Sequence, residues 1–198
     1  MKRIIGIVSI LALTFIVTAC NSNNSENTFE DKKSTHMKEL EGAYVSHGSG
    51  SLPELNIKEL YNSSYIIEGI VKEVSDSEYT EEDGIEMNYT NVVIEVSETL
   101  KGNPKDEIVI RRYGGMTELE DGRIFQYFTE SPHYTEGEQV LLFLTSLEEK
   151  SKVPTGFNAD QYFRTVAHGK WESNNGKYVH YIEKDKELSV EEVKNKIK

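Results

Sequence analysis

Hydrophobic residues at alternate positions predict β-strands along most of the chain after residue 64. Segment 65–74 is rich in isoleucine and valine, and segment 88–100 places valine and isoleucine on one face at the two-residue period of a strand. We expect these two segments to pair. Segment 139–146 is apolar at five consecutive positions, which is typical of a strand that is buried on both faces. It is the best candidate for the centre of the core.

Turn residues mark where the strands end. Asp83-Gly84, within the acidic segment 75–86, supplies the positive φ angles that a tight hairpin turn requires. Asn174-Asn175-Gly176 gives the same signal near the C-terminus. Further strand-like segments lie at 107–113, 123–128, 169–173 and 177–182. Six or seven short strands are therefore expected.

Helical signals are confined to the two ends of this region. Apolar residues at helical spacing after Pro53 predict a short helix that ends at residues 62–64. Near the C-terminus, Ser189 and Glu192 have the spacing of a capping box, in which each side chain accepts a hydrogen bond from the other residue's backbone N–H. A final helix of about two turns should follow. Short strands with only terminal helices favour a small barrel or a sandwich.

The start of the chain has the organisation of an export signal. Lys2 and Arg3 precede an uncharged run of 14 residues at 4–17, and two small residues then lead to Cys20. A membrane-spanning helix is one alternative, but it needs roughly 20 apolar residues, more than this run provides. An ordinary secretory signal with a coincidental cysteine is the other, although Cys20 is the only cysteine of the chain. The sequence predicts a signal peptide at 1–19.

The motif Val17-Thr18-Ala19-Cys20 resembles the lipobox of bacterial lipoproteins, with valine where leucine is commonest. The resemblance implies that the sulfur of Cys20 carries a diacylglycerol. Two acyl chains hold a protein stably at a membrane, whereas one chain holds it only marginally. We therefore expect lipid attachment, with palmitate incorporation, at Cys20 and a location on the outer face of the cell membrane.

Removal of the signal leaves 20 basic and 34 acidic residues, and hence a formal charge of −14. Nucleic acids and anionic lipid headgroups are bound mainly through lysine and arginine, so this charge argues against both as partners. Membrane contact is expected through the lipid anchor instead. With Cys20 acylated, the folded part has neither a disulfide nor thiol chemistry, and its stability must come from an ordinary core.

The mature chain divides into two regions by composition. Segment 20–54 is polar, with few large apolar residues, and is predicted to be a flexible tether. A coil of this length spans roughly 30 Å, which is enough to lift a domain off the lipid headgroups. The remaining 144 residues, at 55–198, suit a single domain.

Several segments of the domain carry a resemblance to known proteins. They are Ile66-Ile67-Glu68-Gly69-Ile70-Val71, Val92-Val93-Ile94-Glu95-Val96, Leu100-Lys101-Gly102, the strand ending in Gly114-Gly115, Pro132-His133-Tyr134 and Glu136-Gly137-Glu138-Gln139-Val140-Leu141-Leu142-Phe143-Leu144. Together they resemble bacterial secreted domains and the netrin-like and tissue-inhibitor-of-metalloproteinase domains, in which a Leu-Lys-Gly turn also follows the second long strand. The resemblance covers about residues 55–182 and implies an OB-like barrel. The expected fold is mainly β, a small OB-like barrel of five to seven strands with a short N-terminal helix and a C-terminal helix.

One departure from these families concerns function. The metalloproteinase inhibitors chelate the zinc of their target through a free N-terminal cysteine that sits on the barrel. Here the sole cysteine, Cys20, is expected to be acylated and to lie a tether away from the barrel. Zinc chelation by this route should not carry over.

Candidates for catalysis and metal binding are weak. His47-Gly48-Ser49-Gly50 combines a histidine and a serine, but it lies in the predicted tether, where nothing excludes water or fixes geometry. The acidic segment 75–86 lacks the pattern of an EF-hand loop, so we interpret it as a solvated hairpin tip. The histidines lack metal-ligand spacing and are expected to be ordinary surface or turn residues: His36, His47, His133, His168 and His180. No catalytic residue, metal site or cofactor is predicted.

Local positive charge beside aromatic residues is unusual in so acidic a chain and marks a candidate binding surface. Its members are Arg111, Arg112, Tyr113, Arg123, Phe125, Tyr127 and Tyr134. Such a mixture can stack sugar rings or anchor a partner protein, and OB-like barrels often bind through one sheet face and its loops. The alternative is that half of the aromatic residues fill the barrel and the arginines pair with neighbouring acids.

Three functional hypotheses follow. The first is a lipid-anchored extracytoplasmic module without catalysis, which binds an envelope protein, peptide or glycan through a barrel face. The second is an envelope hydrolase whose carboxylates meet only in the fold. The third is an inhibitor of a secreted protease, which the netrin-like resemblance suggests.

Overall fold

The computed structural model describes residues 44–47, 52–82, 84–147, 153–154 and 156–197. The predicted signal peptide, Cys20 and most of the predicted tether lie outside the described residues. In the part that is described, strands dominate and the helices are short. None of the helices within these ranges is long and apolar enough to cross a membrane.

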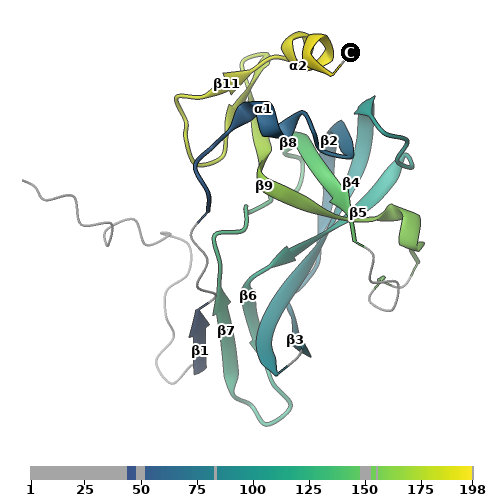
Figure 1. The fold of residues 1–198 in the computed structure, drawn as a ribbon. Helices are drawn as coiled ribbons and strands as arrows, with labels where there is room; N and C mark the ends of the chain where they lie inside the picture. Colours follow the sequence, from purple (N-terminus) through teal and green to yellow (C-terminus); the bar gives the residue numbers. More distant parts are fainter. Residues whose placement is uncertain (1–43, 48–51, 83, 148–152, 155, 198) are drawn as a thin grey trace, which may run out of the picture. The chain divides into compact units, whose positions relative to one another are not determined.

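Five strands close into a barrel (Figure 1). They are β2 (Tyr65–Val74), β4 (Ile85–Lys101), β5 (Glu107–Tyr113), β8 (Gln139–Ser146) and β9 (Tyr162–Asn174). Around the ring, β2 pairs with β4, β4 with β5, β5 with β9, β9 with β8, and β8 with β2. Only the pairing of β5 with β9 is parallel; the other four are antiparallel. This ring is an OB-like barrel, and it confirms the fold class predicted from the sequence.

Alternation along the strands sorts side chains between the inside and the outside of the barrel. One cluster of buried side chains fills the inside: Ile67, Val71, Val92, Ile94, Ile108, Ile110, Tyr134, Val140, Leu142, Leu144 and Phe163. On β8 the intervening residues Leu141 and Phe143 belong to a second cluster outside the ring. This confirms that 139–146 is a strand buried on both faces.

The C-terminal part of the chain covers that second cluster. β9 turns into β10 (Lys177–His180), β11 (Glu187–Leu188) pairs with β10, and the helix α2 (Val190–Lys196) follows. Val193 of α2 and Trp171 of β9 are both fully buried there. A single helical turn, α1 (Ile57–Leu60), contributes Leu60 to the same cluster, and a 3-10 turn, η3 (Ala159–Gln161), leads into β9.

The C-terminal helix starts as the sequence predicts. The hydroxyl of Ser189 accepts a hydrogen bond from the Glu192 backbone N–H at 3.2 Å, and the Glu192 carboxylate accepts one from the Ser189 backbone N–H at 2.8 Å. This reciprocal capping box satisfies N–H groups that a helix otherwise leaves without partners. It confirms both the helix and its first residue.

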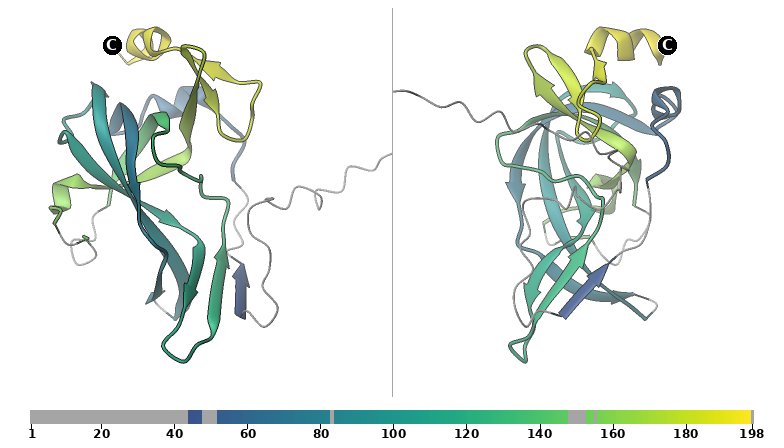
Figure 2. Two further views of the ribbon diagram at one scale, coloured as in Figure 1. Left: turned by 180° about the vertical axis from the view of Figure 1, so that it is seen from behind. Right: turned by 90° about the vertical axis from the view of Figure 1, so that its left-hand side faces the viewer.

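β4 extends beyond the barrel and takes part in a second group of strands (Figures 1 and 2). There it pairs with β3 (Glu78–Glu82), while β1 (Tyr44–His47), β7 (Ile124–Phe128) and β6 (Gly115–Glu118) form a separate three-stranded sheet in that order. The side-chain amide of buried Asn88 ties the two sheets together, because it donates to the backbone oxygens of Gly115 and Phe125, both at 3.0 Å. The ring of Tyr79 packs edge-on against Phe125, with 5.2 Å between the ring centres.

β1 comes from the segment that the sequence analysis assigns to the flexible tether. It pairs in parallel with β7, and the register runs from Tyr44 opposite Phe125 to His47 opposite Phe128. Local sequence gives no sign of this pairing, because its two strands are about eighty residues apart and β1 has only four residues. The structure therefore corrects the prediction of a tether through residue 54 for residues 44–47.

Gly69 lies where β2 bends against β4, next to a shift in their register. A Cβ atom at this position would lie 2.5 Å from Cγ2 of Ile94 and 2.8 Å from the backbone oxygen of Glu95. The two strands can approach this closely only because residue 69 has no side chain.

We predict that Gly69→Ala lowers the free energy of unfolding by about 1–3 kcal/mol, because the added methyl group must push β2 and β4 apart. Urea denaturation followed by circular dichroism measures the change. Glu73→Ala is the matched control on an exposed position of the same strand and should change stability by no more than about 0.5 kcal/mol. Equal stabilities for the two variants would contradict this account of the bend.

Candidate functional site

The residues predicted to form a binding surface do not share one exposed face. Arg111 and Arg112 follow each other on β5, so their side chains leave opposite faces of the strand. Arg111 is only 3% exposed, and its guanidinium lies 3.9 Å from the centre of the Tyr89 ring and 5.4 Å from that of Tyr113. Stacking of a guanidinium between aromatic rings is a favourable cation–π contact. The arginine and its two rings therefore form a packed unit.

Arg112 is also buried, but against a different part of the chain. Its Nε donates a hydrogen bond to the backbone oxygen of Pro132 at 3.0 Å, and a terminal nitrogen lies 3.0 Å from Nδ1 of His133. Burial lowers the pKa of the Arg112 guanidinium. The side chain anchors the segment that leads from β7 to β8.

The other predicted surface residues are divided between the core and the surface. Phe125 and Tyr134 are buried, and the Tyr134 hydroxyl shares a hydrogen bond of 2.7 Å with the hydroxyl of Thr165. Arg123 is exposed and pairs with Asp121 at 2.7 Å, whereas Tyr127 is half-buried. The alternative stated above, in which aromatic residues fill the fold and arginines find local partners, accounts for most of the set.

A buried lysine forms a second polar centre at one end of the barrel interior. Lys170 of β9 is 1% exposed, and its ammonium lies 2.6 Å from Glu138 and 3.2 Å from Glu172. It also lies 4.8 Å from the centre of the Tyr134 ring. Burial opposes ionisation of Glu172, but its pairs with Lys184 and Lys170 outweigh that effect and hold its pKa below the ordinary value. Lys170 is thus a compensated structural charge.

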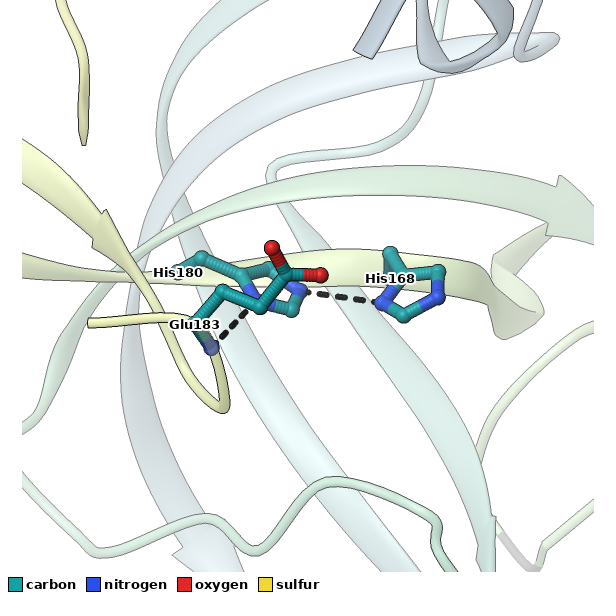
Figure 3. Close-up of side chains that lie close together, drawn as sticks. All are labelled: His168, His180 and Glu183. Carbon is teal, nitrogen blue, oxygen red and sulfur yellow. Dashed lines mark hydrogen bonds between the residues drawn. The ribbon is translucent and has the colours of Figure 1, made fainter. Parts of the chain in front are cut away.

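The strongest candidate site is a pair of buried histidines beside a glutamate (Figure 3). His168 lies on β9, His180 ends β10, and Glu183 lies in the turn that follows. His168 is 6% exposed and His180 is fully buried, and Nδ1 of His168 is 3.3 Å from Nε2 of His180. The ligand atoms of all three residues lie within 4.8 Å of one another.

A bulge in β9 places the His168 side chain there. Residues 166–169 of β9 lie opposite the single residue Phe143 of β8, because the register shifts between Leu142 and Leu144. Within this bulge His168 has a φ of 58°, which is uncommon for a residue with a side chain. Bulges commonly redirect a side chain next to a functional site. Here the backbone oxygen of His168 is also fixed, since it accepts a hydrogen bond from the Trp171 indole at 3.1 Å.

The hydrogen-bond network assigns the proton positions on both rings. The backbone N–H of Glu183 donates to Nδ1 of His180 at 2.9 Å, so this nitrogen carries no proton. The proton of His180 is then on Nε2, from which it is donated to Nδ1 of His168. His168 in turn donates its own Nε2 proton to the backbone oxygen of Pro53. Both imidazoles are neutral, and one chain of hydrogen bonds runs from Glu183 to Pro53.

Burial favours the neutral form of His180. It lowers the pKa of His180 to about 4, and the neighbouring His168 and Lys184 act in the same direction while Glu172 opposes them. Aromatic rings line the pair, since the Trp171 ring centre lies 5.0 Å from that of His180 and the Tyr181 ring centre 4.8 Å from it. Neutral imidazoles are the form in which histidine binds metal ions.

These positions correct the interpretation of two histidines as ordinary surface or turn residues. His168 and His180 are buried together, whereas His133 is exposed, and His36 lies outside the described residues. A usable signal was present in the sequence. The Asn174-Asn175-Gly176 turn sets the register of β9 against β10 and places His180 opposite Trp171, three residues from His168. The bulge in β9, which brings the two histidine rings together, cannot be recognised in the sequence.

Comparisons of the chain with models of protein families, with curated proteins and with solved structures find no match. The assignment of a function therefore depends on the geometry of the described residues.

We predict that Lys170→Met lowers the free energy of unfolding by about 3–5 kcal/mol, because it leaves Glu138 and Glu172 without the cation buried between them. Lys184→Met is the matched control. Lys184 also pairs with Glu172, but its side chain is 57% exposed, so its loss should cost no more than about 1 kcal/mol. Urea denaturation of both variants measures the difference. A similar loss of stability in the two variants would show that burial does not determine how much the ion pairs of Lys170 contribute to the free energy of unfolding.

Proposed function

We propose that this protein is a lipid-anchored binding module on the outer face of the bacterial cell membrane, without catalysis, and that it recognises an extended segment of an envelope protein. The observation that carries the proposal is the pairing of β1 with the edge of β7. The lipobox-like motif at Cys20 and the formal charge of −14 support the location and argue against nucleic acid as the partner.

The edge of β7 has the properties of a strand-binding site. On one side β7 is paired with β6 over four residues, and on the other side it holds the four residues of β1. The edge of a sheet presents backbone N–H and C=O groups that can pair with any extended segment. Addition of a strand to such an edge is a recurring mode of peptide recognition, in which main-chain hydrogen bonds supply affinity.

β7 itself is held firmly enough to serve as a template. Phe125 and Gln126 are buried, and the backbone oxygen of Phe125 accepts the hydrogen bond from Asn88 that ties this sheet to the extension of β4. β1, in contrast, is short, and each of its backbone hydrogen bonds contributes only about 0.5–1.5 kcal/mol. A partner segment can therefore displace β1 from an edge that stays in place.

We predict that Cys20→Ala abolishes the incorporation of labelled palmitate and releases the protein from the membrane fraction, because it removes the only sulfur that can carry the lipid. Metabolic labelling and fractionation of the producing cells measure both effects. Ser22→Ala, two residues further along, is the control and should keep label and location. Unchanged membrane retention of Cys20→Ala would refute the anchor.

A second prediction concerns the edge of β7. A photoreactive amino acid at Tyr127 of the anchored protein should crosslink to β1, since Ser46 lies opposite Tyr127. Replacement of Tyr44–His47 by glycine and serine should shift the crosslink to an envelope protein, because the edge becomes vacant. Mass spectrometry of the products identifies the crosslinked segment in each case.

Two controls make this experiment specific. A peptide of residues 42–49 in excess should suppress the crosslink to the envelope protein, whereas a scrambled peptide should not. The same photoreactive group at Ile182, an exposed position after β10, should not give the product. Crosslinking that is equal at both positions, or that is insensitive to the peptide, would contradict recognition at the β7 edge.

A further inference from the structure

We propose that His168, His180 and Glu183 form a binding site for one divalent transition-metal ion of the zinc type. This inference is independent of the proposed strand-binding edge, because the site lies on other elements. These are β9, β10 and the turn after β10. It rests on the geometry of the three side chains and on their surroundings.

The donor set suits such an ion. Two imidazole nitrogens and one carboxylate oxygen are ligands that Zn²⁺ and Co²⁺ accept readily, whereas Mg²⁺ and Ca²⁺ prefer sites made of oxygen atoms. Three protein ligands leave one position of a tetrahedral ion for water. The fold brings the ligand atoms of all three residues within 4.8 Å of one another, although the second half of β9, a turn and β10 separate His168 from Glu183 in sequence.

The spacing of the two rings fits a shared ion. Two nitrogen ligands of a tetrahedral zinc, each about 2.0–2.1 Å from the metal, lie about 3.3 Å apart. In the structure Nδ1 of His168 and Nε2 of His180 are 3.3 Å apart, and they face each other (Figure 3). An ion can therefore replace the proton between these atoms without a change in their separation.

The surroundings of His168 are those of a metal ligand. Its Nε2 proton is donated to the backbone oxygen of Pro53, which leaves Nδ1 as the coordinating atom and fixes the ring. Such a bond from the second ring nitrogen to a carbonyl or carboxylate is found in most metal-binding histidines. The φ of 58° at this residue is uncommon for a residue with a side chain, and uncommon backbone conformations cluster at binding sites.

The hydrogen-bond chain does not explain the position of the Glu183 carboxylate. Its backbone N–H completes that chain, but within the described part of the chain its carboxylate takes part in no hydrogen bond and no ion pair. The carboxylate is nevertheless half-buried and lies against the ring of His180 (Figure 3). A cation between the rings would supply the partner that this charge lacks.

Metal binding requires one rearrangement, and its proton balance is simple. His180 must release the proton on Nε2 and take one up on Nδ1, so that the ring remains neutral and no net proton is released. The Glu183 N–H must then turn away, because two donors cannot face each other. A single movement of the turn at 181–183 breaks this bond and also brings the Glu183 carboxylate toward the ion. Ile182 in this turn is 50% exposed, so its side chain does not hold the turn in place.

The test uses the full chain in detergent, freed of metal with a chelator and titrated with Zn²⁺ and with Co²⁺. We expect one Zn²⁺ per chain by calorimetry, a rise in Tm on its addition, and the visible absorption of four-coordinate Co²⁺. Mg²⁺ in excess should not displace either ion. Absence of Zn²⁺ binding, or a Co²⁺ spectrum of a six-coordinate ion, would overturn the proposal.

Glu183→Gln is the decisive variant, because it keeps the backbone N–H that bonds to His180 and removes only the charged ligand. The metal-free variant should unfold at the same temperature as the parent, while its Kd for Zn²⁺ rises about tenfold or more. His180→Gln should lose the four-coordinate Co²⁺ spectrum. Glu187→Gln, an exposed acid paired with Lys177, is the matched control and should bind Zn²⁺ unchanged. Equal Zn²⁺ affinity in Glu183→Gln and the parent would refute the site even if the histidine variants do not fold.

Discussion

The pairing of β9 with both β5 and β8 closes the barrel, and the other parts of the domain depend on it. β9 pairs with β5 at only two residue positions, Tyr162 and Phe163. From Phe163 onward it also pairs with β8, and its last residues form half of the hairpin with β10. β9 therefore completes the ring of the barrel and contributes to its interior. It also leads into the C-terminal elements that cover the outside of the barrel. β9 is not regular along this course, since it carries the bulge at 166–169.

The bulge accounts for two of the polar groups that the domain buries. Gly169 within it is needed because a Cβ atom there would lie 2.5 Å from the backbone oxygen of Phe143. On either side of this glycine, His168 and Lys170 are both buried. Each is compensated in a different way, Lys170 by two carboxylates and His168 by a chain of neutral hydrogen bonds. Without these partners, burial of either group would cost a large share of the free energy that stabilises a small domain.

The sequence predicts those parts of the fold that depend on local pattern. Such parts are the isoleucine- and valine-rich segment of β2, the alternation in β4, the apolar run of β8, the Asn-Gly turn before β10 and the capping box of α2. Each is a property of fewer than about twenty neighbouring residues, and each is found in the structure. β1 is different, because four residues with no distinctive pattern pair with a strand about eighty residues away. The pairing of a short edge strand depends on which sheet edge the rest of the fold leaves open, and local sequence does not contain this information.

The candidate site could be predicted only in part for a related reason. Sequence spacing suggests a metal site when the ligands share one helix or one turn, whereas His168 and His180 meet across a hairpin and through a bulge. The predicted surface around Arg111 illustrates the opposite error. Its residues are close in sequence, but strand alternation sends the side chains of Arg111 and Arg112 to different faces. Both are buried, Arg111 against the Tyr89 ring and Arg112 against the segment at Pro132.

Contacts of three kinds connect the start of the described region to the rest of the domain, and they differ in strength. The backbone N–H of Leu52 donates to the carboxylate of Glu130 at 2.9 Å. The backbone oxygen of Pro53 accepts from the ring of His168, which also bonds to His180 and whose backbone oxygen is fixed by the Trp171 indole. β1, a few residues earlier, is held by one short edge pairing. Release of β1 would therefore leave Leu52 and Pro53 in place, because their bonds to Glu130 and His168 do not depend on β1. The edge of β7 and the histidine pair thus hold two different parts of the N-terminal segment, the first by backbone pairing alone and the second through buried side chains.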